Sequence, residues 1–427
     1  MAHVLLYTRM ARVLCILMCS WCHVPAFAWM TPECQNIVRS TCVGHCYPEL
    51  AGVPCDDIRC KISSDGRDQP KMEHCNCSWN AKMANLLATC DSRADGSVTV
   101  FGAGEANISC FRIPAIVRTV KGTLLAFAEA RHGGCGDGQV HQIAVRRSID
   151  QGKTWSELTF AAGSDQLFVG NPYPIAMSGG DVALVFVNHT HGHGADLGSG
   201  NGVIFSRDDG ITWSAPLDIS QGFGAATGSL PGPGAGIELG ASHRMLVVSH
   251  HGAYVNDYIS YSDDRGTTWK TIGQTFPKMD EATLADLGGG SVLLNMRHRA
   301  ENTKGRGVAR SQDGGLSWSN ITYDSALIGP VCQGSMAAFN GSVFFSNPAS
   351  SSGRDHLTVR RSDDGGHTWT AKLLIQEGRS AGYSSLVQGP VLDDNHGGIL
   401  YESTAAGSVD FTVFPLNFQD RDLTVIV

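Results

Sequence analysis

The sequence is poor in charged residues and contains no run of lysine or arginine. Asp, Glu, Lys and Arg together make up 17% of the 427 residues, and the formal net charge is -8. Nucleic acids are bound mainly by clustered basic side chains that neutralise phosphates. The sequence therefore gives no electrostatic basis for a nucleic-acid-binding protein.

Long apolar segments and helical periodicity are also nearly absent. Beyond residue 28, no stretch approaches the roughly 18 apolar residues of a membrane-spanning helix, so we expect no transmembrane segment after a leader is removed. The best candidate for a helix is short, at 80–89. Glycine, in contrast, is frequent, with 51 residues, and the apolar runs between turn residues are short. These features are typical of an all-β protein.

Patterns for a serine nucleophile or a metal site are weak or missing. No G-x-S-x-G turn is present. His189, His191 and His193 would lie on one face of an extended segment and could bind a metal. The intervening glycines and the glycosylation sequon at Asn188 favour a solvent-exposed loop instead. We expect neither a metal nor an organic cofactor.

The first 28 residues are typical of a secretory signal peptide. Arg9 and Arg12 supply a basic start, 13–21 is mostly apolar, and Ala26-Phe27-Ala28 fits the cleavage pattern. The alternative, an N-terminal membrane anchor, is disfavoured because the apolar stretch is short for a bilayer. We predict that 1–28 is removed and that the protein is secreted or lumenal, including lysosomal. Five Asn-x-Ser/Thr sequons fit this route, and they begin at Asn76, Asn107, Asn188, Asn320 and Asn340.

Cysteine usage points to the same oxidising compartment. Eight of the 14 cysteines crowd into 29–95, which predicts a small disulfide module there. A zinc site is the weaker alternative, because paired C-x-x-C spacing is missing. The spacing leaves the pairing of these eight open. Cys110, Cys135 and Cys332 follow, and their odd number implies a free thiol or an unusual pairing.

One short pattern, S-x-D-x-G-x-[ST]-W, occurs five times and is called the box below. The copies begin at Ser148, Ser206, Ser262, Ser311 and Ser362. Asp can accept hydrogen bonds from the backbone of a tight turn, Gly supplies positive φ, and Trp anchors the turn in the core. We interpret the boxes as folding elements. An EF-hand calcium loop is excluded, because its acidic spacing and its distal Glu are missing.

The spacing of the boxes predicts the architecture. A hairpin turn that recurs about every 50 to 60 residues indicates one four-stranded blade in each repeat. Further strand-like runs lie at 97–101, 111–118, 122–127 and 409–414. We predict a six-bladed β-propeller over 96–427, preceded by the disulfide-rich module. We expect a strand from each end of the domain to pair in the last blade, which leaves no open edge.

The boxes resemble the Asp-boxes of sialidases, which also occur in propellers without enzymatic activity. Phe111-Arg-Ile-Pro114 resembles the [FY]-R-I-P motif that opens the sialidase propeller, and 122–131 resembles the hairpin that follows it. The resemblance runs from about residue 98 to the end and is closest to the animal lysosomal-type sialidases. It implies an exo-α-sialidase (neuraminidase) that hydrolyses terminal α-linked sialic acids from glycoproteins, oligosaccharides and gangliosides.

The resemblance also implies a binding site for the carboxylate of sialic acid. Arg112, Arg297 and Arg354 match the three arginines that grip it, and Arg131 matches a further substrate-contacting position. Arginine stays charged at any working pH and binds carboxylates in bidentate fashion. Glu402 matches the glutamate that holds the first arginine and supplies a counter-charge.

Three further residues match catalytic positions: Asp137, Glu281 and Tyr383. Sialidases are an exception among retaining glycosidases because their nucleophile is a tyrosine. A neutral phenol beside a base avoids repulsion from the carboxylate of the substrate. The resemblance implies that Glu281 takes the phenol proton while Asp137 protonates the leaving oxygen and then activates water. Two displacements, through a covalent sialyl-tyrosine, give retention.

Other interpretations of these residues remain open at this point. Asp137 could be a turn residue in its glycine-rich loop, and Asp280 with Glu281 could be a solvated pair. A non-catalytic sialic-acid-binding lectin or receptor would need only the arginines, and a trans-sialidase would differ only in its acceptor. The oligomeric state is left open. Arginines near the boxes that match no motif are expected to be surface charges or ion pairs, namely Arg310, Arg360 and Arg361.

Overall fold

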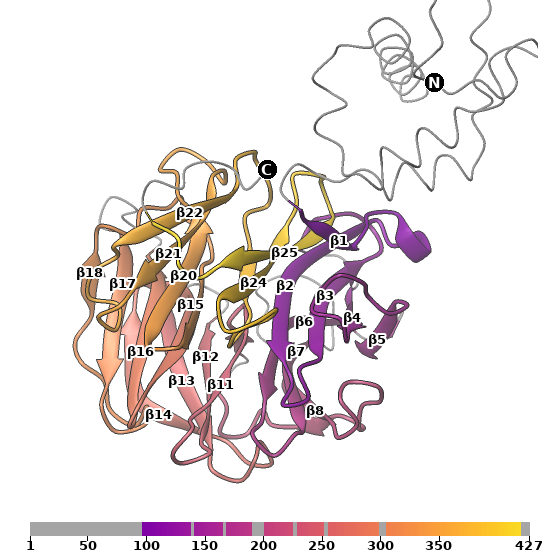
Figure 1. Ribbon diagram of the computed structural model, residues 1–427. Helices are drawn as coiled ribbons and strands as arrows, with labels where there is room; N and C mark the ends of the chain where they lie inside the picture. The colour runs from indigo at the N-terminus through magenta and orange to yellow at the C-terminus, as the bar shows by residue number, and fades with distance from the viewer. Residues whose placement is uncertain are drawn as a thin grey trace, which may run out of the picture. The chain divides into compact units, whose positions relative to one another are not determined.

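The computed structural model of the chain describes residues 96–137, 141–164, 168–189, 200–224, 229–251, 255–298 and 305–419 (Figure 1). The predicted signal peptide, the disulfide-rich module and the candidate helix lie outside these residues, as do His191 and His193 of the possible metal site. Those predictions are therefore untested. The only helical element among the described residues is a 3-10 turn, η4 (Glu105–Asn107).

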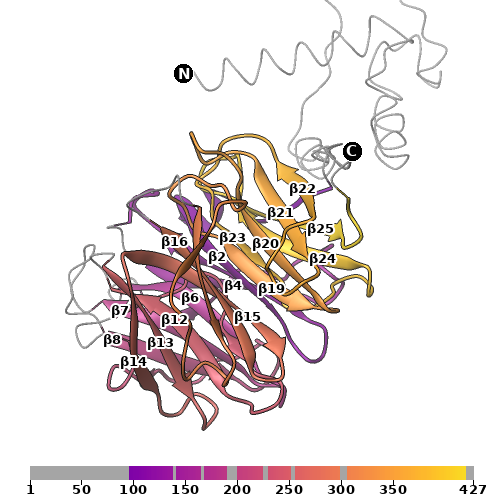
Figure 2. The same ribbon diagram turned by 90° about the vertical axis from the view of Figure 1, so that its left-hand side faces the viewer.

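The described strands form six antiparallel sheets, which are the blades of a β-propeller (Figures 1 and 2). Blade I contains β2 (Cys110–Arg118), β3 (Leu124–Arg131), β4 (His141–Ser148) and β5 (Thr159–Ala162). Blade II contains β6 (Phe168–Ala176), β7 (Val182–His189), β8 (Gly200–Ser206) and β9 (Leu217–Asp218). Blade III contains β10 (Leu230–Pro231), β11 (Ile237–Glu238), β12 (Met245–His250), β13 (Asn256–Ser262) and β14 (Lys270–Pro277).

The other three blades follow the same plan. Blade IV contains β15 (Met279–Gly288), β16 (Ser291–His298), β17 (Arg306–Ser311) and β18 (Thr322–Asp324). Blade V contains β19 (Ser335–Phe339), β20 (Ser342–Pro348), β21 (Leu357–Ser362) and β22 (Ala371–Gln376). Blade VI contains β23 (Ser384–Leu386), β24 (His396–Glu402), β25 (Val409–Pro415) and β1 (Val98–Phe101).

Blade VI closes the ring with strands from both ends of the domain. β1 pairs antiparallel with β25, with Val98 opposite Phe411. Figure 1 shows this junction, where the indigo β1 lies beside the yellow β25. The predicted six-bladed propeller and its mode of closure are confirmed. Pairing the first strand with the last removes two edges that could otherwise pair with another chain.

Burial falls from the inner to the outer strands of a blade. In blade I, every residue of β3 is buried, whereas the outer strand β5 has no buried residue. Inner strands such as β2, β6, β15, β19 and β23 contact the neighbouring blades, so that they are covered on both faces. Such strands are expected to be rich in apolar residues, and a charged side chain among them requires a partner.

The five boxes adopt one geometry. In the second box, the Ser206 hydroxyl donates to Asp208 and accepts from the backbone N–H of Gly210, and both the backbone and the hydroxyl of Thr212 donate to Asp208. Gly210 has a φ of 81°, which a side chain would strain. Equivalent bonds recur in the other four boxes. The boxes are folding elements, as predicted.

Box tryptophans join neighbouring blades. Trp213 of blade II packs edge-on against Phe127 of blade I, and Trp318 of blade IV packs against Phe276 of blade III. Trp155 of blade I reaches Phe411 on β25, so the same contact also reinforces the closure. The tryptophan therefore anchors its turn to the preceding blade as well as to its own.

The three arginines near the boxes differ from one another. Arg361 forms the expected ion pair with Asp363, at 2.7 Å. Arg310 donates to the carbonyls of Gly365 and Gly366 and thereby holds the fifth box. The prediction for Arg360 was wrong, because it is 7% exposed and bonds to the amide oxygen of Asn347 at 2.6 Å. Strand alternation turns Arg360 inward, where burial lowers its pKa to about 10.

Among the described residues, no helix has the length and apolar character that crossing a membrane requires.

Candidate active site

Tyr383 and Glu281 lie in contact at the inner strands of blades VI and IV, although 102 residues separate them in the sequence. Tyr383 immediately precedes β23, the first strand of blade VI, and Glu281 lies on β15, the first strand of blade IV. The two side chains are 7% and 6% exposed. The Tyr383 hydroxyl donates a hydrogen bond to Oε1 of Glu281. The sequence predicted this nucleophile and base, and the structure brings them together.

A β-bulge aims Glu281 toward this point. In the β15–β16 ladder, Asp280 pairs with Arg297 and Ala282 pairs with Met296, so Glu281 is the extra residue. A bulge of this kind redirects a side chain and is common beside active sites. Both carboxylates then face Arg297, whose Nη1 bonds to Glu281 and whose Nε lies 3.3 Å from Asp280. Glu281 and Asp280 are buried, so the solvated pair is excluded.

Glu402 holds Arg112 and Tyr383 together. Its Oε1 accepts from Nε of Arg112 at 2.9 Å and from the backbone N–H of Ile113 at 3.2 Å. Its Oε2 accepts from the backbone N–H of Tyr383 at 2.9 Å. Glu402 is 3% exposed and therefore acts as a buried counter-charge that also fixes the backbone before β23.

Arg354 lies on the loop between β20 and β21 and has a different environment. Its Nη1 donates to the carbonyl of Ala381 at 2.7 Å, and its Nη2 lies 3.4 Å from the carbonyl of Val331. Within the part of the chain that the structure describes, no carboxylate lies within 4.0 Å of Arg354. This guanidinium is oriented by neutral carbonyls and keeps its positive charge available for an anion.

The three predicted triad arginines surround Tyr383. The guanidinium carbon of Arg112 lies 5.1 Å from the centre of the Tyr383 ring, and that of Arg354 lies 5.5 Å from it. Arg297 reaches the Tyr383 hydroxyl through Glu281. Among the described residues, no group accepts a hydrogen bond from the buried Nη2 of Arg112. Three guanidinium groups that converge beside a phenol form a binding site for a carboxylate.

Asp137 and Arg131 lie on the Arg112 side of the site. Nη1 of Arg131 is 2.8 Å from the Asp137 carboxylate, and Nη1 of Arg112 is 3.2 Å from the same oxygen. Arg131 is 2% exposed and bonds to Glu129, whereas the Asp137 side chain is 77% exposed. Asp137 is therefore exposed to solvent and also contacts Arg112 and Arg131, so its side chain does more than shape its own turn.

Burial and charge set the protonation of the central pair. Burial first, and then the charge of Glu281, raise the pKa of Tyr383 well above its ordinary value. Burial would also raise the pKa of Glu281, but the Arg297 guanidinium and the Tyr383 hydroxyl outweigh it and lower the pKa below its ordinary value. The free protein consequently holds a neutral phenol hydrogen-bonded to a carboxylate.

A second group of buried ionisable residues lies near Arg297, and the sequence did not predict that these residues are part of the site. Arg306 is 4% exposed and bonds to Asn295 and to the carbonyl of Cys332, and burial, followed by the charge of Arg297, lowers its pKa to about 10. Burial raises the pKa of Asp257 well above its ordinary value and lowers that of His250. No motif marked these residues. The one available signal was that Arg306 begins the strand before the fourth box.

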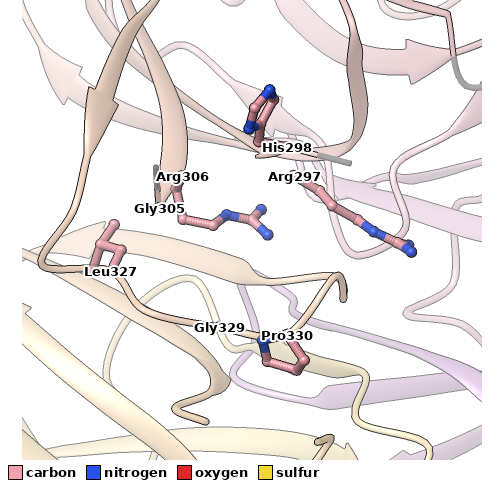
Figure 3. Close-up of a pocket in the computed structure, with 7 residues that line it drawn as sticks. All are labelled: Arg297, His298, Gly305, Arg306, Leu327, Gly329 and Pro330. Atoms are coloured by element: carbon pink, nitrogen blue, oxygen red, sulfur yellow. The ribbon is translucent and has the colours of Figure 1, made fainter. Parts of the chain in front are cut away.

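Figure 3 shows a pocket beside these residues. The guanidinium of Arg306 extends into it between His298 and Pro330. Its lining residues are Arg297, His298, Gly305, Arg306, Leu327, Gly329 and Pro330. The pocket adjoins the Arg297 side of the site, and the two arginines Arg297 and Arg306 are among its lining residues. Glu129, which orients Arg131, is a further residue that the sequence did not reveal.

Cys332 packs against Tyr383 and Ile113 as a free, buried thiol. Burial raises its pKa to about 12, so it is inert as a nucleophile. Among the described residues, no group of three or more His, Cys, Asp or Glu side chains is placed to hold a metal ion.

Comparison with known proteins identifies relatives of this chain. Residues 122–393 match the model of the BNR repeat-like domain. The chain is 33% identical over 346 residues to a sialidase of Bacteroides fragilis, a match that covers 72% of this chain and 63% of that protein. It is 32% identical over 336 residues to a sialidase of Micromonospora viridifaciens, covering 70% of this chain and 50% of that protein. The chain thus spans only part of the length of these relatives.

Solved structures share the fold. The Hadza microbial sialidase Hz136 superposes with a TM-score of 0.67 at 29% identity, covering 75% of this chain and 68% of that one. A leech intramolecular trans-sialidase superposes with a TM-score of 0.65 at 16% identity, covering 79% of this chain and 72% of that one. The second likeness concerns the fold alone.

Fold and site define a β-propeller with a carboxylate-binding cluster of arginines around a tyrosine and a glutamate. With the sequence similarity to the two sialidases and the BNR repeat-like domain, the chain belongs to the sialidase family. Both of these sialidases are bacterial proteins.

Proposed function

We propose that this protein is an exo-α-sialidase, which hydrolyses terminal α-linked sialic acids from glycoproteins, oligosaccharides and gangliosides. The observation that carries the proposal is the hydrogen bond from Tyr383 to Glu281 inside a ring of three arginines. Sialic acid bears a carboxylate on its anomeric carbon. A carboxylate held by Arg112, Arg297 and Arg354 would bring that carbon to the phenol.

The proposed first step forms a sialyl-tyrosine. The Tyr383 oxygen attacks the anomeric carbon while its proton passes to Glu281. The bond from that carbon to the glycosidic oxygen breaks, and Asp137 gives this oxygen a proton. The neutral phenol supports this assignment, because a carboxylate nucleophile would be repelled by the carboxylate of the substrate.

The second step releases sialic acid. Water attacks the anomeric carbon and gives a proton to Asp137 as the bond to the Tyr383 oxygen breaks. Tyr383 then recovers its proton from Glu281. Two inversions leave the product with the configuration of the substrate. No cofactor is needed for either step.

The first test compares wild type with Tyr383→Phe. We expect wild type to release the fluorophore from a 4-methylumbelliferyl α-sialoside between pH 4 and 7, and the folded variant to lose nearly all turnover. Proton NMR of the first-formed product should show the α-anomer. A 2,3-difluoro sialic acid should add covalently to the peptide that contains Tyr383.

Other outcomes of this test lead to other functions. A well-folded wild type that binds sialosides without turnover would be a lectin, and this result would refute the hydrolase. Transfer of sialic acid to added lactose in preference to water would identify a trans-sialidase. The sequence relatives are named as sialidases, which favours hydrolysis.

We also propose that the protein enters the secretory pathway and is secreted or lysosomal. The disulfide between Cys110 and Cys135 supports an oxidising compartment. Mass spectrometry of the protein from its native source should find a new N-terminus after Ala28. An intact N-terminus would contradict cleavage.

A further inference from the structure

The disulfide between Cys110 and Cys135 links two parts of the active site. Cys110 is the first residue of β2, and Arg112 lies two positions after it. Cys135 lies in the loop after β3, two positions before Asp137. The bond therefore ties the segment that carries the proposed acid to the strand that carries an arginine of the triad.

Side-chain packing does little to hold the described part of this loop, 132–137. Three of its six residues from 132 to 137 are glycines, and a side chain placed on Gly134 or Gly136 would meet nothing within 4 Å. His132, Gly133, Cys135, Gly136 and Asp137 are exposed. Glycine-rich segments without packed side chains lose much conformational entropy when they are ordered. A covalent link at Cys135 removes part of that freedom before substrate binds.

The inner end of the link is rigid. Cys110 is fully buried, and the backbone N–H of Phe111 donates to the carbonyl of Gly407 at 2.8 Å. A Cβ on Gly407 would lie 3.1 Å from Sγ of Cys110 and 3.3 Å from Sγ of Cys135. The turn between β24 and β25 thus packs closely on both sulfur atoms. The anchor of the loop is shared between blades I and VI.

The link also places hydrogen-bonding groups. The carbonyl of Cys135 accepts from Nη1 of Arg131 at 2.6 Å, and the same nitrogen lies 2.8 Å from the Asp137 carboxylate. Fixing Cys135 thereby fixes the Arg131 guanidinium and the carboxylate together. The Ser109 hydroxyl, which donates to the carbonyl of His132 at 2.8 Å, ties only the start of the loop.

We propose that Cys110 and Cys135 are positioning residues of the catalytic site, whose disulfide holds Asp137 where it can donate a proton to the leaving group. The proposal rests on the sialidase activity proposed above. It predicts that losing the disulfide impairs proton donation more than it impairs binding or nucleophilic attack. Substrates that need the proton most should be affected most.

The experiment compares Cys135→Ser with wild type on two substrates. Sialyllactose has a poor leaving group that needs protonation, whereas 4-methylumbelliferone leaves with little help. The comparison uses kcat/KM, which reports formation of the sialyl-tyrosine, because Asp137 also acts in the second step, which the two substrates share. We expect kcat/KM on sialyllactose to fall by up to about 100-fold, the loss that a misplacement of about 1 Å can cause. We expect kcat/KM on the aryl sialoside to fall less than about threefold. Cys110→Ala/Cys135→Ala, which leaves no free sulfur, should give the same ratio.

Two controls separate positioning from stability. Thr368→Ala in the fifth box removes a hydroxyl that bonds to Asp364, and it should lower the melting temperature without changing the ratio of the two kcat/KM values. In an Asp137→Ala background, Cys135→Ser should cause no further loss on sialyllactose. If it slows that background as much as it slows wild type, the disulfide acts independently of Asp137 and the positioning role is refuted.

Wild-type turnover is measured first and tests the parent proposal. Wild type that hydrolyses neither substrate would overturn the sialidase activity and the positioning role together. Wild type that hydrolyses both, with equal losses on the two substrates in Cys135→Ser, would overturn the positioning role alone.

Discussion

At the scale of single residues, the site is organised by shared carboxylates. Glu281 accepts from Tyr383 and Arg297, and Glu402 accepts from Arg112 and from the backbone of Tyr383. Each glutamate therefore joins Tyr383, the proposed nucleophile, to one of the three arginines. Buried guanidinium groups require such counter-charges. The charge of Arg297 in turn keeps Glu281 ionised and able to act as a base.

This coupling predicts the acidic side of the pH profile. The pKa of Glu281 is lowered, chiefly by Arg297, so the proposed base stays deprotonated to a lower pH than an ordinary glutamate. We expect the acid limb of kcat/KM on the aryl sialoside to lie below the pKa of an ordinary glutamate. Arg297→Met removes the main cause of the lowered pKa and should move this limb to higher pH, besides raising KM.

Arg354→Met is the matched control for this prediction. Arg354 also belongs to the proposed carboxylate site, but it bonds to backbone carbonyls and not to Glu281. It should raise KM and leave the acid limb in place. A limb that shifts equally in both variants, or that stays in place in both, would contradict the assignment of Glu281 as the base.

Motif residues could be predicted from the sequence, whereas the residues that support them could not. Tyr383, Glu281 and Arg112 carry recognisable local patterns. Arg306 and Arg360 lie in ordinary strand sequence, and only the packing of the blades decides that they are buried. From the sequence alone, an arginine before a box is interpreted as a surface charge, because the face of its strand that points into the blade is not known. That face depends on register, which long-range pairing sets.

At the scale of elements, bulges and boxes perform separate tasks. Bulges in β2 and β15 interrupt the inner ladders next to Arg112 and at Glu281. The boxes lie between the outer strands and hold each blade against the one before it. The sequence predicted the boxes because their side chains bond locally. It did not predict the bulges, because a bulge is defined by the partner strand.

The contact between blades predicts the effect of removing a box tryptophan. Trp318 is 8% exposed, packs against Phe276 with ring centres 6.0 Å apart, and donates to the carbonyl of Gly315. Trp318→Ala should lower the free energy of unfolding by about 3 to 5 kcal/mol, the usual range for a large buried aromatic residue. Urea denaturation followed by fluorescence measures this change.

Leu316→Ala in the same box provides the comparison. Leu316 is 43% exposed, so its loss should change the free energy of unfolding by less than about 0.5 kcal/mol. Similar small effects from both variants would mean that the tryptophan does not hold the blades together. At temperatures where both variants are folded, kcat/KM should match that of wild type, because neither residue lies near Tyr383.

At the scale of the whole molecule, the active site depends on closure of the ring. Blade VI contributes Tyr383 and Glu402, and this blade is completed by β1 from the start of the domain. The ring brings residues from blades I, IV, V and VI to one point near the axis. The recurrence of the boxes predicted the blades and their closure, since five boxes and a closing pair of strands account for six blades. The convergence of the site residues was instead implied by the resemblance to sialidases.

Closure leads to a prediction about truncation. A chain that begins at residue 96 keeps β1, whereas one that begins at residue 102 lacks it. In the longer chain, Thr99 donates to Asp410 at 2.9 Å and Phe101 stacks on Phe111 with ring centres 5.3 Å apart.

We expect 96–427 to turn over the aryl sialoside with the kcat/KM of the full chain. We expect 102–427 to expose β25 as a free edge, to melt at lower temperature or aggregate, and to lose most of its activity. Thermal melting, light scattering and initial rates distinguish the two. If 102–427 is as stable and as active as 96–427, then the pairing of β1 with β25 is dispensable, and Tyr383 and Glu402 must be held in place by the rest of blade VI and by the contacts of β23 and β24 with blades I and V.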